Sequence, residues 1–363
     1  MNSFRLSSLS IVNYRSYESL LLNFEKRVNL IVGRNGIGKT NVLDAIYLLS
    51  FSKGFLASSE QQNIRKGAEE FLVKGSFDVK GKETEVFCGF KKGKKKAFKR
   101  NGKEYEKIRD HIGMFPAILV SPQDSELISG GAEMRRKFMD GHLSQVSNSY
   151  LDVLTRYSKG MIQRNAALKS RSGGLELMLE AMDYKLAPLG EEIRKQRQRF
   201  FEDLQAPFEK YYALLSDERE EVCLSYKEPE CSVADGWLEN RQKDLALGYT
   251  STGPHRDELR FKMDGHAIRR FGSQGQQKSF LLALKLAQAE LLEATLKISP
   301  ILLLDDVFDK LDNQRVALLV EKVVQPYKGQ VFITNTQEGE MMQQMEKAEV
   351  QLWNLDEEGI LSE

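Results

Sequence analysis

Cysteine, long apolar runs and net charge are all scarce in this sequence. The 363 residues include three cysteines, Cys88, Cys223 and Cys231, and no Cys-x-x-Cys pair. This excludes a disulfide framework and argues against a zinc site. No run approaches the roughly 18 apolar residues that a membrane span needs, and the first residues lack a signal-peptide pattern. We therefore expect a soluble protein of a reducing, cytoplasmic compartment, without membrane contact.

The charges nearly cancel, since 53 Lys and Arg face 52 Asp and Glu and leave a net charge of +1. A uniformly basic nucleic-acid coat is therefore excluded, and any nucleic-acid contact must come from a local patch. With 41% apolar and 29% charged residues the composition is globular. The length favours two domains or one large one.

Strand and helix patterns alternate at both ends of the chain. Apolar runs at 28–32, 117–120, 300–304 and 330–334 predict buried strands, and 40–49, 275–294 and 312–324 predict helices. Such alternation is typical of a mainly parallel sheet covered by helices. Residues 71–79 and 84–90 predict an antiparallel hairpin that turns at Lys80-Gly81.

The middle of the chain has a different character. Residues 133–216 are almost free of strand patterning and predict a helical lobe. We expect a turn between two helices at 171–174, and Pro188 and Pro207 should kink or break the second helix.

The segment Gly33-Arg-Asn-Gly-Ile-Gly-Lys-Thr40 fits the pattern G-x-x-x-x-G-K-[ST] between a predicted strand and a predicted helix. In such a phosphate-binding loop the backbone N–H groups face phosphate oxygens. Lys39 then neutralises the β- and γ-phosphates, and the Thr40 hydroxyl holds Mg²⁺. The alternative is an ordinary glycine turn.

Two carboxylates, Asp305 and Asp306, follow the buried run at 300–304. We expect Asp305 to hold Mg²⁺ beside the phosphate-binding loop and Asp306 to orient the attacking water. The alternative is a pair of surface carboxylates that cap the next helix. Upstream, Ser273-Gln-Gly-Gln-Gln277 opens a predicted helix and could bind a phosphate or simply cap that helix.

Together the loop, the Ser273–Gln277 segment and Leu302–Asp312 resemble the head of an ABC-class ATPase. The resemblance implies ATP and Mg²⁺ as cofactors and two nucleotides sandwiched between two subunits. It also implies that the Ser273–Gln277 segment of one subunit closes on the γ-phosphate held by the other. Asp312 would lie in a loop at the dimer contact.

Three further segments narrow the resemblance. Asn13-Tyr-Arg15, Ser121-Pro-Gln-Asp124 with Arg135-Arg136 downstream, and Ser251-Thr-Gly-Pro-His-Arg-Asp257 resemble the RecF family of bacterial recombination mediators over essentially the whole chain. The stretch from Gln123 to Ser273 is too short for the long coiled-coil arm of SMC-type proteins.

The family resemblance implies an α/β ABC-type head with an antiparallel β subdomain and an inserted helical lobe. The ATPase lobe would comprise 1–125 and 250–363, and the helical lobe 126–249. Gln123 departs from the acidic residue usual at its position and is expected to sense Mg²⁺ and water. No histidine follows the strand at 330–334, so the γ-phosphate contact could fall to Thr334 or Asn335.

The expected nucleotide-site residues are Gly33, Arg34, Asn35, Gly36, Ile37, Gly38, Lys39, Thr40, Asn41, Arg15, Gln123, Ser273, Gly275, Gln276 and Asp312. Lys39 and Asp306 are the expected catalytic residues, and Thr40, Asp305 and Gln123 the expected Mg²⁺ ligands. We expect slow ATP hydrolysis used as a switch, and no nuclease activity.

Two basic runs are candidates for DNA contact, although solvated surface is the alternative for each. They lie at the tip of a predicted hairpin and on the predicted long helix. The candidate residues are Lys91, Lys92, Lys94, Lys95, Lys96, Lys99 and Arg100 in the first run and Arg194, Lys195 and Arg197 in the second. Aromatic residues are nearly absent between them, so the phosphate backbone of duplex DNA fits better than stacked single-strand bases.

Three functions remain open on sequence alone. The resemblance implies a DNA-repair mediator that dimerises with ATP into a clamp on duplex DNA near gaps and releases it on hydrolysis. It implies a RecR-type partner and loading of recombinase during repair, replication restart and the SOS response. The alternatives are the ATPase subunit of an ABC transporter, disfavoured by the missing histidine, and a small-molecule kinase.

Overall fold

The computed structural model describes residues 4–170, 174–216, 220–226, 231–308, 313–336, 345, 349–355 and 360–362. Its internal contacts divide the chain into two units. Unit 1 comprises Met1–Asp124, Tyr211–Glu218 and Lys278–Glu363, and unit 2 comprises Ser125–Lys210 and Arg219–Gln277. These units differ from the predicted lobes mainly at residues 250–277, which we assigned to the ATPase lobe and which belong to unit 2. The functional division at 125/126 and 249/250 stays a prediction.

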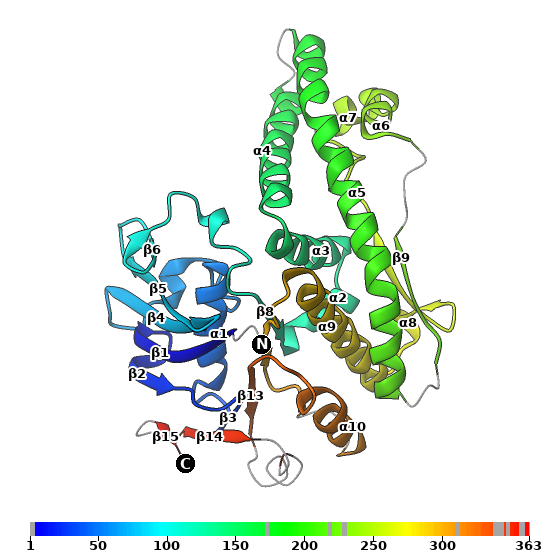
Figure 1. The fold of residues 1–363 in the computed structure, drawn as a ribbon. Coiled ribbons are helices and arrows are strands. Elements are labelled where there is room, and N and C mark those ends of the chain that lie inside the picture. Colours follow the sequence, from blue (N-terminus) through cyan, green and yellow to red (C-terminus); the bar gives the residue numbers. More distant parts are fainter. Residues whose placement is uncertain are drawn as a thin grey trace. The chain divides into compact units, whose positions relative to one another are not determined.

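A parallel sheet forms the centre of unit 1, with the strand order β15-β14-β3-β13-β12-β8 (Figure 1). Its strands are β3 (Val28–Val32), β8 (Ala117–Val120), β12 (Ile301–Leu304), β13 (Val331–Asn335), β14 (Val350–Leu355) and the antiparallel edge strand β15 (Ile360–Ser362). Every residue of β3, β12 and β13 is buried. Continuous apolar runs suit strands covered on both faces, so the predicted buried strands are confirmed.

The position of β3 in this sheet joins the two ends of the chain. β3 pairs with β13 on one side and with β14 on the other. Near the N-terminus, the Gln330 side-chain amide donates to the carbonyl of Leu6 at 3.0 Å and accepts from its N–H at 2.7 Å. The sheet therefore needs both the first and the last segments of the sequence.

A second, antiparallel sheet of unit 1 has the order β2-β1-β4-β5-β6-β7. It comprises β1 (Phe4–Tyr14), β2 (Tyr17–Asn23), β4 (Glu70–Val79), β5 (Lys82–Lys91), β6 (Ala97–Arg100) and β7 (Lys103–Glu104). The predicted hairpin at Lys80-Gly81 is confirmed, and both turn residues have positive φ, 57° and 78°. β1 and β2 were not predicted.

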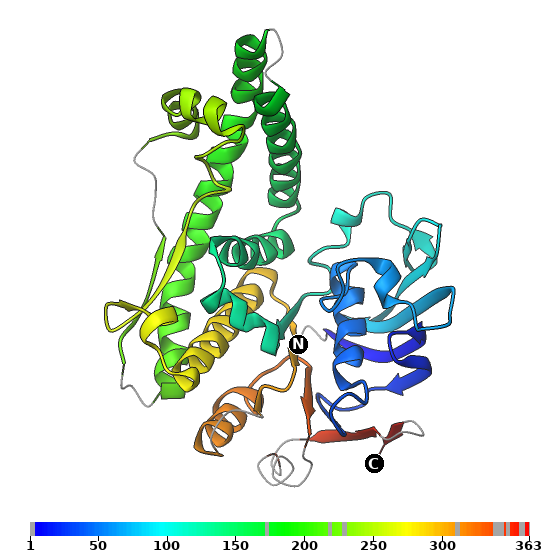
Figure 2. The ribbon, with the colours of Figure 1, turned by 180° about the vertical axis from the view of Figure 1, so that it is seen from behind.

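The helix α1 (Lys39–Phe51) contacts strands of both sheets, among them β1, β4, β8 and β13. Seen from behind, it lies against the antiparallel sheet (Figure 2). Its apolar side chains, including Val42, Ile46 and Leu49, are fully buried in a core shared with both sheets. The predicted helix after the glycine loop is therefore confirmed. Its packing anchors the end of the loop to the core.

The remaining helices of unit 1 are short or shared with unit 2. They are α9 (Gln274–Leu296), α10 (Asn313–Leu319) followed by a π-helical turn at Val320–Val324, and short 3₁₀ turns at Glu60–Asn63, Ile108–Asp110 and Pro122–Ser125.

Unit 2 is mainly helical, as expected. Its helices are α2 (Glu126–Ser129), α3 (Ala132–Val146), α4 (Asn148–Ser170), α5 (Leu175–Ser216), α6 (Val233–Glu239), α7 (Arg241–Leu247) and α8 (Ile268–Phe271). A small sheet of β9 (Val222–Tyr226), β10 (Leu259–Met263) and β11 (His266–Ala267) accompanies them. The predicted turn at 171–174 falls largely outside the described residues.

The prediction was that the prolines kink or break the long helix, and the break does not occur. α5 is one helix of 42 residues that contains both Pro188 and Pro207. A proline inside a helix costs about 3 kcal/mol, but the turns around each proline bury large side chains such as Leu186 and Phe208. Tertiary packing outweighs the local preference. Within the described residues, no helix combines the length and apolarity of a membrane span.

Candidate nucleotide site

The glycine loop connects β3 to α1, the arrangement that a phosphate-binding loop requires. Gly38, directly before α1, has φ of 121°. A Cβ there would come within 2.7 Å of Ser16 Oγ and 2.8 Å of Tyr17 Oη. Both the backbone conformation and the close approach of β2 therefore require glycine. The Tyr17 hydroxyl donates to the Gly38 carbonyl at 3.1 Å and holds the loop against the second sheet.

Lys39 is buried, and its ammonium lies inside the loop. Its Nζ donates to the carbonyl oxygens of Gly33 at 2.8 Å and Arg34 at 3.2 Å. The positive charge is thus held by the first carbonyl groups of the loop, and in a phosphate-binding loop a lysine at this position neutralises the β- and γ-phosphates of a nucleotide.

Thr40 and Asp305 meet at the end of the parallel sheet. Thr40 donates its hydroxyl to Asp305 Oδ1 at 2.8 Å, and Thr334 at the end of β13 donates to the same oxygen at 2.9 Å. The Asp306 N–H donates to Thr334 Oγ1 at 2.9 Å. Carboxyl ends of parallel strands are the usual place for a ligand, and here β3, β12 and β13 bring these groups together.

The donor set fits Mg²⁺, which prefers hard oxygen ligands from one or two carboxylates with the remainder from water and phosphate. Burial raises the pKa of Asp305; the hydrogen bonds from Thr40 and Thr334 and the charge of Lys39 oppose this shift, whereas Asp306 adds to it. A bound cation would offset the cost of burying this carboxylate. Thr40 and Asp305 are therefore the residues of this cluster suited to the ion.

Gln123 follows β8, the neighbour of β12, and is exposed. Its turn is fixed by Asp124, which accepts from the Ser121 N–H at 2.8 Å and pairs with Lys285 Nζ of α9 at 2.7 Å. Asp305 N–H donates to the Val120 carbonyl at 2.8 Å. Gln123 thus stands three residues beyond the strand that flanks Asp305.

Arg15 and Asn41 take part in a network that sequence reasoning missed. Arg15 lies 3.4 Å from Asp44, a fully buried carboxylate of α1 that also accepts from Tyr14 at 2.7 Å and from the Phe55 N–H at 2.6 Å. Asn41 donates to Ser16 Oγ at 2.8 Å. A signal was present, because Asp44 interrupts the apolar face of a predicted helix.

Ser273 directly precedes α9 and is exposed. The Ser273 N–H donates to Gln276 Oε1 at 2.7 Å, and the Gln276 N–H donates to Ser273 Oγ at 3.2 Å. This reciprocal pair is a capping box. Ser273 therefore does cap the helix, as the alternative interpretation expected. Its side chain nevertheless stays exposed at the surface of unit 2. Asp312 lies outside the described residues.

The basic hairpin tip divides into paired and solvent-facing lysines. Lys91 pairs with Glu70 at 3.4 Å and Lys92 with Glu69 at 2.9 Å. Lys96 contacts Glu60 and the Ser52 carbonyl and is half-buried. Lys94 and Lys95 are exposed. Further along β6, Lys99 lies over the Phe87 ring and Arg100 over the Tyr105 ring.

The basic run on α5 is less accessible than expected. Arg197 is 3% exposed, and its guanidinium makes two 2.9 Å bonds to Asp140 and one of 2.7 Å to the Pro254 carbonyl. Burial lowers the pKa of Arg197, but the charge and hydrogen bonds of Asp140, with smaller effects of Tyr150 and Tyr226, raise it overall. This placement argues against phosphate contact by Arg197.

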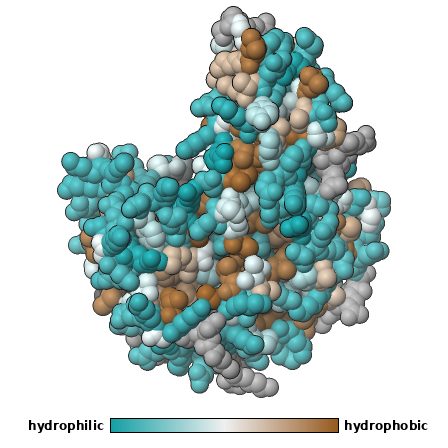
Figure 3. All heavy atoms as spheres, turned by 45° about the horizontal axis from the view of Figure 1, so that its top comes forward, coloured by the Kyte–Doolittle hydropathy of each residue, from teal (hydrophilic) through white to brown (hydrophobic). Residues whose placement is uncertain are grey.

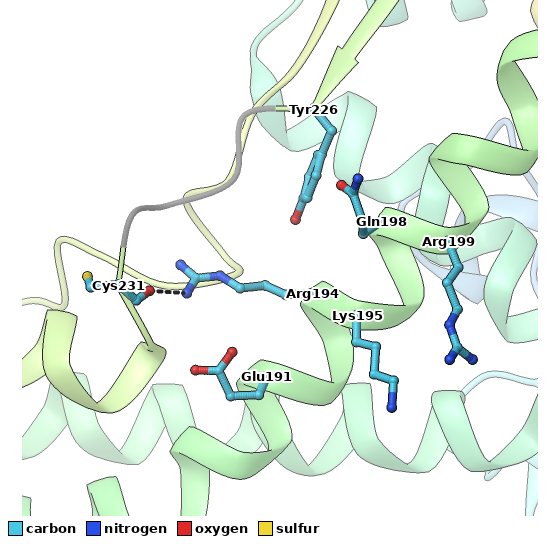
Figure 4. A pocket seen from close by; sticks show the side chains of 7 residues that line it. All are labelled: Glu191, Arg194, Lys195, Gln198, Arg199, Tyr226 and Cys231. Atoms are coloured by element: carbon cyan, nitrogen blue, oxygen red, sulfur yellow. Dashed lines mark hydrogen bonds between the residues drawn. The ribbon is translucent and has the colours of Figure 1, made fainter.

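Arg194 and Lys195 line a hollow of about 410 Å³ in unit 2 (Figure 4). Arg194 forms a bidentate pair with Asp257 at 3.0 and 3.2 Å and points toward the Cys231 carbonyl, whereas Lys195 and Arg199 are exposed. The other lining residues are Glu191, Gln198, Tyr226 and Cys231.

Comparison with known proteins first defines the class. The family model RecF/RecN/SMC N terminal domain matches residues 5–355. A Pyrococcus furiosus Smc head domain, solved bound to the C-terminal domain of ScpA, has a TM-score of 0.62 at 17% identity over 99% of this chain and 96% of that one. At that identity the likeness shows a shared ATPase-head fold, which confirms the predicted fold class.

The family follows from nearer relatives. The DNA replication and repair protein RecF of Bacteroides fragilis is 42% identical over 91% of this chain and 90% of that protein. Flavobacterium johnsoniae RecF is 43% identical over 91% and 94%. A structure titled as the recombination mediator protein RecF with ATPrS in the RecFOR pathway has a TM-score of 0.89, 29% identity and coverage of 99% and 98%. The chain belongs to the RecF family of DNA replication and repair proteins.

Proposed function

We propose that the protein is an ATP-dependent recombination mediator that dimerises on duplex DNA near single-strand gaps and leaves on slow hydrolysis. The observation that carries this is the cluster of Thr40, Asp305 and Thr334 beside the buried Lys39. Two similar solved structures are described as RecF-ATP and RecF-ATPrS, which supports a nucleotide at this site.

In this proposal, ATP and Mg²⁺ are held by the loop amides, Lys39, Thr40 and Asp305, with Gln123 as a further Mg²⁺ contact. Bound Mg²⁺ would neutralise phosphate charge. Lys39 supplies a second positive charge from inside the loop. Asp306 lies beside Asp305 with its backbone fixed by Thr334, and from there it would orient the attacking water.

Dimerisation would follow from the exposed helix start at Ser273. The segment with Ser273, Gly275 and Gln276 lies at the positive end of α9, which suits a phosphate held by another subunit. The N–H groups of Ser273 and Gln276 would exchange their capping bonds for bonds to that phosphate. Two subunits would enclose two nucleotides, and hydrolysis would release them. The RecFOR pathway named for the similar structures further suggests RecO- and RecR-type partners and recombinase loading.

Lys94, Lys95 and Lys195 are the basic side chains that best suit DNA phosphates in this proposal, because they are exposed, whereas the exposed Lys91 and Lys92 are held in ion pairs. Lys91, Lys92, Lys99 and Arg100 would contribute from their paired positions, and Arg194 would have to leave Asp257. We omit Arg197.

The test is fluorescence anisotropy of a labelled, gapped duplex titrated at two salt concentrations with Mg-ATP, with Mg-ADP and without nucleotide. Tight, salt-sensitive binding with ATP alone is expected. Ser273→Arg should bind ATP normally yet neither dimerise nor bind DNA tightly. Ser232→Arg is the matched control, because Ser232 is also an exposed serine cap, at α6.

Equal DNA binding with and without nucleotide, or ATP-dependent dimers of Ser273→Arg, would overturn the proposal. Absence of DNA binding in every state would also overturn the proposal for the isolated chain and would mean that DNA contact needs a partner protein.

A further inference from the structure

The outer face of α5 carries apolar side chains that nothing in the described chain covers. On its inner face the helix packs on α4: Leu179 is buried with Ala167 and Leu168. The helices approach closely at Gly160, where a Cβ would fall 2.2 Å from Leu186 Cδ2. On the opposite face Leu177 is 75% exposed and Tyr184 84% exposed. Apolar side chains reach the surface near the end of this hairpin in Figure 3.

Ala181 and Pro188 complete this face and are also exposed. We call Leu177, Ala181, Tyr184 and Pro188 the α5 stripe. Its members are spaced by four, three and four residues and lie within about 60° of one another around the helix. This is the spacing of the a and d positions of a coiled coil, with Leu177 and Tyr184 at d. It is therefore the pattern of a helix seam that meets another helix.

Charges beside the α5 stripe indicate which helix it fits. Glu180 and Lys185 occupy the g and e positions on opposite flanks of the stripe, and both are exposed. In a parallel pair of coiled helices, a g residue faces the e residue five positions later on the partner. Glu180 would then face Lys185 of a second copy, twice per pair. In an antiparallel pair g residues face g residues and e residues face e residues, so Glu180 would not meet Lys185 of the second copy.

We propose that the α5 stripe docks against the same stripe of a second copy of this chain, with the two helices parallel about a two-fold axis. The seam is short, less than two heptads, so the contact is weak by itself. It gains strength when another contact already holds two copies together, because the second association is then intramolecular. It needs no nucleotide, and it stands independently of the proposed ATP-driven dimer.

Disulfide trapping in the full-length chain tests the geometry. A cysteine at a d position of a parallel pair lies opposite its own counterpart. In a background with Cys223→Ser and Cys231→Ser, Tyr184→Cys should give a covalent dimer under mild oxidation, severalfold more than Ile162→Cys. Ile162 is a matched control, since it is 71% exposed on α4 and lies outside the α5 stripe.

The flanking charges give a second, independent readout in the Tyr184→Cys protein. Glu180→Lys and Lys185→Glu should each lower the dimer yield, by roughly threefold or more, because each puts like charges opposite one another. An equimolar mixture of the two variants should restore it as a heterodimer. A misfolded variant would not be rescued in this way.

Equal trapping of Tyr184→Cys and Ile162→Cys, or no recovery on mixing, would overturn the proposal. Sedimentation of the unoxidised wild-type chain with ATP reports the ATP-driven dimer separately. The two measurements therefore show separately whether the α5 stripe pairs and whether ATP drives dimerisation.

Discussion

Thr40, at the start of α1, donates its hydroxyl hydrogen to Asp305 at the end of β12, across 2.8 Å. The two residues are 265 positions apart in the sequence. This bond joins the phosphate-binding loop to the strand that carries the carboxylates, and it defines where a divalent cation fits best.

Replacement of Thr40 by valine should therefore weaken Mg-ATP binding and slow hydrolysis about tenfold or more, because an oxygen ligand is lost. It should also cost about 1–3 kcal/mol of stability, because buried Asp305 loses a donor. Thr40→Ser keeps the hydroxyl and should retain most activity. Equilibrium binding of a fluorescent ATP analogue with phosphate release checks this. Unchanged Mg-ATP affinity in Thr40→Val would contradict the assignment.

The lysines of the β5–β6 hairpin should separate into two classes. Lys94→Glu with Lys95→Glu should weaken DNA binding and flatten its salt dependence, by about two phosphate contacts, without loss of stability. Lys96→Glu should instead destabilise the fold, because it opposes Glu60 in a half-buried pair. DNA titrations at several salt concentrations and urea denaturation measure the two effects. Equal DNA-binding defects without destabilisation would contradict this division.

Buried histidines should make the protein sensitive to acid. Burial lowers the pKa of His142 to about 3 and those of His111 and His255 to about 4, below the ordinary 6.5. The unfolded chain therefore binds more protons, and stability should fall as the pH drops from about 6.5 toward 4. Each histidine contributes up to about 1.4 kcal/mol per pH unit.

Urea midpoints measured between pH 7.5 and pH 4.5 test this slope. His142→Leu should make the slope shallower, because the buried His142 lies against the Phe200 ring and, within the described residues, its Nδ1 has no hydrogen-bond partner. His266→Leu, at an exposed position, should leave the slope as it is. An unchanged slope in His142→Leu would show that other groups cause the acid sensitivity.

Arg164 should be among the most sensitive positions of unit 2. Its side chain is fully buried, pairs with Asp183 at 2.7 Å and Asp244 at 3.1 Å, and lies over the Trp237 ring. Arg164→Met removes the guanidinium partner of the fully buried Asp244, while Asp183 keeps its pair with Arg241, and should cost about 3–5 kcal/mol. Arg156→Met breaks an exposed pair with Asp152 and should cost less than about 1 kcal/mol. Similar urea midpoints for both variants would contradict this difference.

Short-range patterns predicted the parallel strands β3, β8, β12 and β13, the helix α1 and the phosphate-binding loop, because each is specified by a few adjacent residues; they did not predict the parallel strand β14. They could not predict β1 and β2, whose burial alternates irregularly and whose pairing with β4 includes a register shift between Leu6 and Ser8. They left open a break in α5 at Pro188 and Pro207, which does not occur, because packing of the buried side chains around the prolines is not part of local propensity.

The site shows the same division. Lys39, Thr40 and Asp305 could be predicted from the sequence, because phosphate binding requires a lysine and Mg²⁺ binding requires oxygen ligands at these positions of the motifs. The partners that fix them were not, because the Asp124–Lys285 pair and the contacts of Asp44 join segments far apart in the sequence. For the same reason the accessible Lys195 could not be told from the enclosed Arg197 two residues later on the same helix.

The pairing of β3 with both β13 and β14 dictates an order of assembly on the ribosome. Synthesis proceeds from the N-terminus, and domains fold as their residues emerge. The contacts of unit 2 lie within Ser125–Gln277 and can form while the last strands are still being translated. The phosphate-binding loop cannot gain its neighbouring strands until residue 355 has emerged. A nascent chain that ends before residue 355 therefore lacks a complete nucleotide site.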